Sequence, residues 1–87
     1  TNNNSKKVLK YCEQYLTKIK STQYTAHVKT YIAMADAIKN DSPKKSREYL
    51  NLGLSRVKNT FPEFKEGYEE TIYKKLQELN ELDTESL

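Results

Sequence analysis

The chain has 87 residues, of which 36% are hydrophobic and 31% are charged, so we expect a single small domain with a narrow core. Its one cysteine, Cys12, excludes an internal disulfide and favours a reducing, cytoplasmic location. No apolar run approaches the ~20 residues that a membrane-spanning helix needs. The net charge of +3 is unevenly distributed, with +5 over residues 1–35, +3 over 36–62 and −5 over 63–87.

Two helices are predicted in the first half of the chain, over residues 5–20 and 24–39, after a disordered segment over residues 1–4. Ser5 is the expected N-cap of the first helix. In both segments apolar side chains recur at helical spacing. The stripe of the first helix is Val8, Cys12, Leu16 and Ile19, and that of the second is Tyr24, Val28, Tyr31, Ile32, Ala35 and Ile38.

A third helix is predicted over residues 43–58, because Ser42 is a good N-cap and Pro43 fits the first helical position. Its apolar face consists of Tyr49, Leu50, Gly53, Leu54 and Val57. A glycine inside a helix costs about 1 kcal/mol relative to alanine. We therefore expect Gly53 to allow close approach of a neighbouring helix.

A fourth helix is predicted over residues 61–81. Thr60 and Glu63 have the spacing of a capping box, in which each side chain satisfies a backbone N–H near the start of the helix. The apolar stripe is Phe64, Tyr68, Ile72, Leu76 and Leu79. We expect a helical domain over residues 5–82 and a polar tail over 83–87.

Short connections place successive helices antiparallel, so the four segments predict a small all-α, antiparallel four-helix bundle. Stacked helical hairpins are an equally open arrangement of the same four segments. The sequence does not indicate an oligomeric state.

The sequence offers little that is typical of catalysis. His27 is the only histidine, and a phosphotransfer domain would have Lys three and Gly four residues later, where this chain has Thr30 and Tyr31. One histidine and one cysteine do not supply a usual zinc site, and Cys12 falls on an apolar stripe. We therefore expect no enzyme activity, no metal and no cofactor.

We expect instead a non-catalytic protein-interaction module, which binds a helical or extended peptide in a groove between the second and third helices. Leu52 carries part of this expectation because it lies off the apolar stripe of its own helix. The expected partner-binding residues are Tyr31, Met34, Ile38, Tyr49, Leu52 and Arg56.

Residues 8–58 resemble a MIT (microtubule-interacting and trafficking) domain. Tyr24 and Tyr31, with Ala26 between them, look like its second helix, and Glu48-Tyr49-Leu50 followed by Gly53 and Val57-Lys58 is similar to its third. The resemblance implies binding of short helical tails of membrane-remodelling proteins between these two helices. Leu52 stands where the family has Arg, and the fourth helix is additional to the three-helix pattern. Tetratricopeptide-like hairpins are a rival, because Ser46 and Gly53 are small residues seven apart.

The alternative function is that of a small basic helical protein that binds nucleic acid or acts as a regulator. Lysine and arginine side chains gather on the third predicted helix, and contacts to phosphate groups need such a cluster. The possible phosphate contacts are Lys44, Lys45, Arg47 and Lys58.

Overall fold

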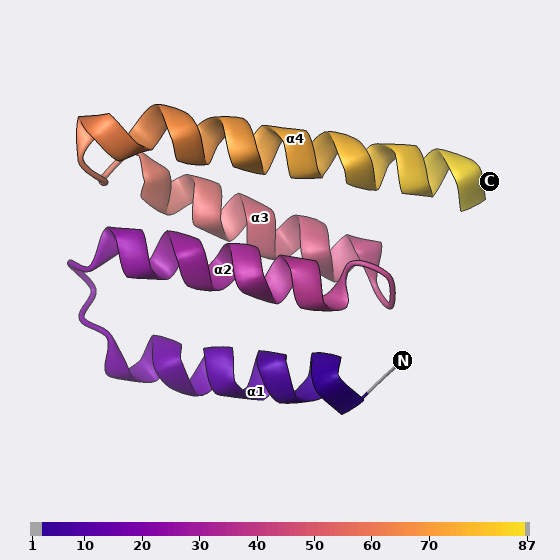
Figure 1. Ribbon diagram of the computed structural model, residues 1–87, viewed down its shortest axis with the longest axis horizontal. Helices are drawn as coiled ribbons and strands as arrows, with labels where there is room; N and C mark the ends of the chain where they lie inside the picture. The colour runs from indigo at the N-terminus through magenta and orange to yellow at the C-terminus, as the bar shows by residue number, and fades with distance from the viewer. Residues whose placement is uncertain (1–2, 87) are drawn as a thin grey trace.

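The computed structural model describes the backbone of residues 3–86 and the side chains of residues 4–81. This part of the chain forms four helices, α1 (Asn3–Lys18), α2 (Tyr24–Ile38), α3 (Pro43–Val57) and α4 (Pro62–Ser86). Each helix runs antiparallel to the one before it, so both ends of the chain lie at the same end of the molecule (Figure 1). The all-α four-helix fold expected from the sequence is confirmed.

The helix bounds differ from the expected ones mainly near the chain ends. α1 begins at Asn3 and ends at Lys18, two residues earlier than expected at each end, whereas α4 continues to Ser86. Residues 82–86 include neither Gly nor Pro, so no helix-breaking residue stops α4 there. The expected disordered segment (1–4) and polar tail (83–87) are thus helical at 3–4 and 83–86. Thr1, Asn2 and Leu87 lie outside the described residues.

The core lies between α2, α3 and α4. α2 packs against α3 over most of its length, while α1 packs against α2 and α4 packs against α3. The buried apolar side chains are Val28, Met34, Ala35, Leu50, Val57, Ile72 and Leu79. None of the described side chains of α1 is buried. α1 is therefore an edge helix that rests on a three-helix unit.

Small residues bring α2 and α3 close together. A Cβ atom added at Gly53 would lie 3.4 Å from the Cβ of Tyr31 and 3.7 Å from Cδ1 of Ile72 on α4, so the expected close approach at Gly53 is confirmed. Two turns earlier, the buried hydroxyl of Ser46 donates a hydrogen bond of 2.8 Å to the backbone carbonyl of Ala35. Because a buried hydroxyl without a partner is costly, this bond favours the observed alignment of the two helices.

The two ends of α3 use side-chain hydroxyls differently. At its start, Ser42 Oγ accepts a hydrogen bond from the backbone N–H of Lys45, so the predicted N-cap is confirmed. At its end, Thr60 Oγ1 donates to the carbonyl of Val57 at 2.7 Å. The carbonyl of Phe61 accepts the first helical hydrogen bonds of α4, so Phe61 and not Thr60 precedes the helix. The capping box expected at Thr60 is therefore wrong, since its hydroxyl closes α3 instead.

The turn between α1 and α2 is held by three contacts to Lys20. Its backbone N–H donates to Gln23 Oε1 at 2.8 Å, and its carbonyl accepts from the backbone N–H of Gln23 at 3.0 Å. His27 Nε2 lies 3.1 Å from the same carbonyl. Because a carbonyl can only accept, His27 carries its proton on Nε2 and links the start of α2 to the turn.

Candidate binding surface

A wide opening lies where the α1–α2 turn meets the α3–α4 turn, at the end opposite the chain termini (Figure 1). Its volume is about 820 Å³. A second opening of about 310 Å³ follows the line between α1 and α2, and the two share Tyr15, Lys29 and Thr30. We call both openings together the aromatic groove. Its principal lining residues are Tyr11, Cys12, Tyr15, Tyr24, Ala26, Lys29, Thr30, Ala33 and Phe61.

Three aromatic side chains stand open to water around this groove. Tyr11 and Phe61 are each 67% exposed, and Tyr15 is 48% exposed. Tyr11 and Tyr15 are one turn apart and project from the same side of α1. Phe61 reaches the groove because α4 begins one residue later, which leaves the Phe61 ring outside the helix. An aromatic cluster of this kind offers a large apolar area with polar hydroxyls at its edge.

Lysines flank the two tyrosines along α1. Lys7, Tyr11, Tyr15 and Lys18 follow one another at spacings of 4, 4 and 3 residues, which places them on one face of the helix. All four are exposed. The exposed Lys29 adds a third cation from α2.

The floor of the groove is formed by small side chains. Ala26 and Ala33 belong to α2, and between them Thr30 is buried with its hydroxyl donating to the carbonyl of Ala26 at 2.7 Å. Thr30 therefore presents its methyl group and no unpaired hydroxyl hydrogen. Small residues at this spacing leave room for another backbone to lie close to α2.

Cys12 completes this floor from the side of α1. Burial raises the pKa of the Cys12 thiol, and the negative charge of Glu13 raises this pKa further. A thiol with a raised pKa stays protonated at neutral pH and is a poor nucleophile. Cys12 thus contributes a small, weakly polar side chain to the groove.

α2 and α3, which carry the expected partner-binding residues, pack closely against each other. Met34 is only 1% exposed, so its side chain is enclosed by the chain itself, and a contact of Met34 with a partner stays a prediction. Leu52 is 43% exposed. The remaining expected residues, Tyr31, Ile38, Tyr49 and Arg56, are half-buried.

The residues expected to contact phosphate are spread along α3. Lys44 and Lys45 are exposed at its start and Lys58 is exposed just after its end, which a helix of this length separates by about 20 Å. Arg47 is half-buried and engaged in a contact of its own. The structure therefore does not gather these four side chains into one cluster.

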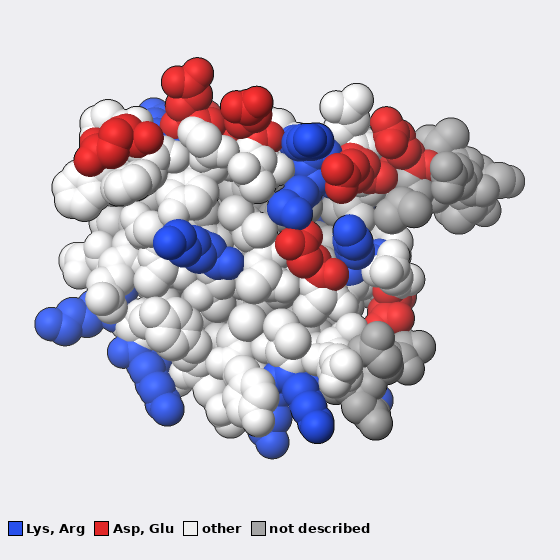
Figure 2. All heavy atoms as spheres, in the orientation of Figure 1, with Lys and Arg blue, Asp and Glu red and all other residues white. Residues whose placement is uncertain are grey.

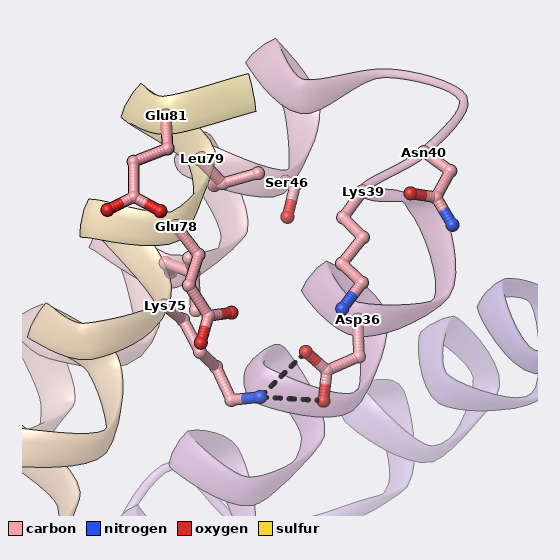
Figure 3. A pocket seen from close by; sticks show the side chains of 9 residues that line it. Asp36, Lys39, Asn40, Ser46, Lys75, Glu78, Leu79 and Glu81 are labelled. Atoms are coloured by element: carbon pink, nitrogen blue, oxygen red, sulfur yellow. Dashed lines mark hydrogen bonds and ion pairs between the residues drawn. The ribbon is translucent and has the colours of Figure 1, made fainter. Parts of the chain in front are cut away.

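A further cavity, of about 280 Å³, opens between the end of α2, the start of α3 and the second half of α4. Figure 3 shows Lys75 of α4 reaching across this cavity to Asp36 of α2, with an Nζ to Oδ1 distance of 2.9 Å. Glu78 and Glu81 lie on the α4 side, and the hydroxyl of Ser46 is already bonded to Ala35. Lys75 and Asp36 pair across the helices, so we assign this cavity a structural role.

Charge is distributed unevenly around the aromatic groove. Figure 2 shows acidic side chains gathered over α4 and basic side chains along the edge formed by α1, with a few side chains of both signs on the largely uncharged surface between them. Residues 1–35, which form α1 and most of α2, carry six lysines and a single acidic residue, Glu13. The groove thus lies in a positive part of the surface, and the acidic helix lies at the opposite edge.

None of Tyr11, Tyr15, Lys29 and Phe61 was assigned to a binding surface from the sequence. The signal that could have found the two tyrosines is their helical spacing with Lys7 and Lys18. Phe61 could not be found in this way, because its exposure depends on where α4 begins.

Comparison of the chain with protein-family models, with curated protein sequences and with solved structures finds no match. Within the described residues, no group of three or more His, Cys, Asp or Glu side chains is arranged to hold a metal ion. No helix in this part of the chain combines the length and the apolar character that crossing a membrane requires.

Proposed function

We propose that this chain is a non-catalytic protein-interaction module that acts inside the cell and binds a peptide segment of a partner in the aromatic groove. The observation that best supports this is the exposure of Tyr15 and Phe61 at the opening of about 820 Å³ and of Tyr11 at the adjoining opening of about 310 Å³. Aromatic side chains at the centre of an interface commonly carry much of its binding energy. A segment that covered these rings would remove their apolar surface from water.

The MIT-like segment over residues 8–58 supports the same class of function, because domains of that family bind short helical tails. The groove that the family uses, between its second and third helices, corresponds here to the packed contact of Gly53 with Tyr31. We therefore place the peptide on the neighbouring α1–α2 face.

Selection of a displayed peptide library on the purified chain tests this function. We expect peptides that bind the wild-type chain and lose about tenfold or more in affinity with Tyr11→Ala or Phe61→Ala, since truncated aromatic anchors commonly cost more than 1 kcal/mol. Tyr73→Ala on α4 is the matched control, because Tyr73 is also exposed but lies outside the groove. Failure to select any peptide, or loss of binding only with Tyr73→Ala, would contradict the proposal.

Binding of single-stranded nucleic acid is the second candidate, favoured by one observation. Exposed Tyr11 and Tyr15 between Lys7 and Lys18 could stack bases while the lysines contact phosphates. Titration of a labelled thymidine oligonucleotide separates the two functions, because nucleic-acid affinity should fall steeply with added salt. An oligonucleotide that binds more tightly than any selected peptide would favour this second candidate.

A further inference from the structure

α1 packs mainly on α2 and buries none of its described side chains. A helix in a small domain covers its apolar stripe by packing it against other elements. On the aromatic groove, α1 and α2 present two parallel walls with the small residues Ala26 and Ala33 between them. A helix laid along this line would contact both walls.

The apolar part of the groove suits a helix with one apolar face. Tyr11 and Tyr15 are spaced by one helical turn along α1 and Phe61 lies at one end of the line, so apolar side chains at positions i, i+4 and i+7 of a partner helix could meet them in succession. A single strand of nucleic acid would need only the aromatic rings, on which its bases stack. The small side chains of Ala26, Thr30 and Ala33 also allow the close approach that a second helix requires.

The charges around the groove define the polar face of such a helix. Lys7 and Lys18 flank the tyrosines on α1, and Lys29 stands on the α2 wall. Glu13 is the single acidic residue among residues 1–35, and its charge acts on Tyr49 of α3. Carboxylates at the edges of an incoming helix would therefore meet cations on both walls.

We propose that the aromatic groove binds an acidic amphipathic helix of a partner protein, which packs its apolar face on Tyr11, Tyr15 and Phe61 and pairs its carboxylates with Lys7, Lys18 and Lys29. This inference rests on the proposed function and specifies the chemistry of the partner. Opposite charge on the two surfaces raises the association rate and selects against basic helices.

Two synthetic helical peptides of about 16 residues, the length of α1, test the inference. They share one apolar face, and their polar face carries glutamate in one and lysine in the other. By fluorescence anisotropy we expect the acidic peptide to bind at least about tenfold more tightly than the basic one. We also expect its affinity to fall when salt is raised from about 50 to about 300 mM, because salt screens exposed charges.

A charge-neutralised variant identifies the surface involved. Replacing Lys7, Lys18 and Lys29 together by glutamine should reduce affinity for the acidic peptide about tenfold or more, while Lys44→Gln with Lys45→Gln, the matched control on α3, should leave it unchanged. Circular dichroism of both variants checks that the helices are retained.

Several outcomes would overturn the inference. They are equal binding of the two peptides, tighter binding of a thymidine oligonucleotide, or acidic-peptide binding that survives the triple lysine replacement. A further such outcome is self-association of the chain through the groove, measured by sedimentation, because the groove would then bind the acidic α4 of a second copy. If library-selected peptides bind at Tyr11 but are not acidic, the inference fails while the proposed function stands; if no peptide of any kind binds, both fail.

Discussion

Gly53 and Gly67 both lie inside helices, yet an added methyl group would meet different surroundings at the two positions. No atom lies within 4 Å of a Cβ built at Gly67, whereas at Gly53 the Cβ of Tyr31 is 3.4 Å away. We expect Gly67→Ala to raise the free energy of unfolding by about 0.5–1 kcal/mol, because alanine favours the helix. Gly53→Ala should gain less, and Gly53→Val should lower stability by about 1–3 kcal/mol through overpacking.

Urea unfolding followed by circular dichroism measures these three changes on one scale. Gly67→Ala serves as the control for helix propensity, since its added methyl group touches nothing. A Gly53→Val variant as stable as the wild-type chain would contradict the close contact between α2 and α3.

Tyr49 makes the stability of the fold sensitive to alkali. Burial raises the pKa of Tyr49 above its ordinary value of 10.0, and the charges of Glu13 and Glu48 and the nearby Tyr31 raise this pKa further. The folded chain thus holds the phenol proton to higher pH than the unfolded chain does. This contribution to stability is complete below pH 10.0 and is lost as the pH rises through the higher folded-state pKa.

The measurement is the urea midpoint as a function of pH between about 8 and 12, the range around the ordinary pKa of tyrosine. We expect the midpoint to fall above about pH 10, and Tyr49→Phe to reduce the fall because phenylalanine keeps the ring but does not ionise. Tyr11→Phe, at an exposed position outside this contact, is the matched control. A Tyr49→Phe curve that coincides with the wild-type curve would disprove this role.

Among the four helices, α1 is held least firmly, because its described side chains are at most half-buried whereas α2, α3 and α4 share the buried core. We expect backbone amides of α1 to exchange hydrogen faster than those of α2 and α3, since exchange follows the free energy of local opening. Leu50→Ala should cost about 2–5 kcal/mol of stability and Leu16→Ala distinctly less. Native-state exchange measured by NMR tests this, and equal protection of α1 and α3 amides would refute it.

At the scale of the whole molecule, periodicity and capping residues were enough to predict four helices in their correct order. Ser42 and Pro43 fixed the start of α3 to the residue, because their preferences act locally. The groove could not be predicted in the same way. Its position depends on which pairs of helices touch, and Ser46 and Gly53 hold α2 and α3 in close contact.

The same dependence on packing is seen at individual residues. Met34 lies outside the apolar stripe expected on α2, yet it is only 1% exposed, which follows from the arrangement of the helices. Thr60 matched a capping pattern, yet its hydroxyl donates a hydrogen bond to the carbonyl of Val57 at the end of α3. The molecule measures 39 × 27 × 14 Å along its principal axes, so most helices have one face at the surface and sequence alone does not say which.

Ser46 and Gly53 stand two turns apart on α3, and both are fixed against α2. A slide of α3 by one turn, about 5.4 Å, would separate the Ser46 hydroxyl from its acceptor and drive a bulkier side chain into the space beside Tyr31. The two helices therefore have a single axial alignment and behave as one unit. α1 takes no part in this alignment, so a tilt of α1 about its turn at Lys20 would leave the alignment intact.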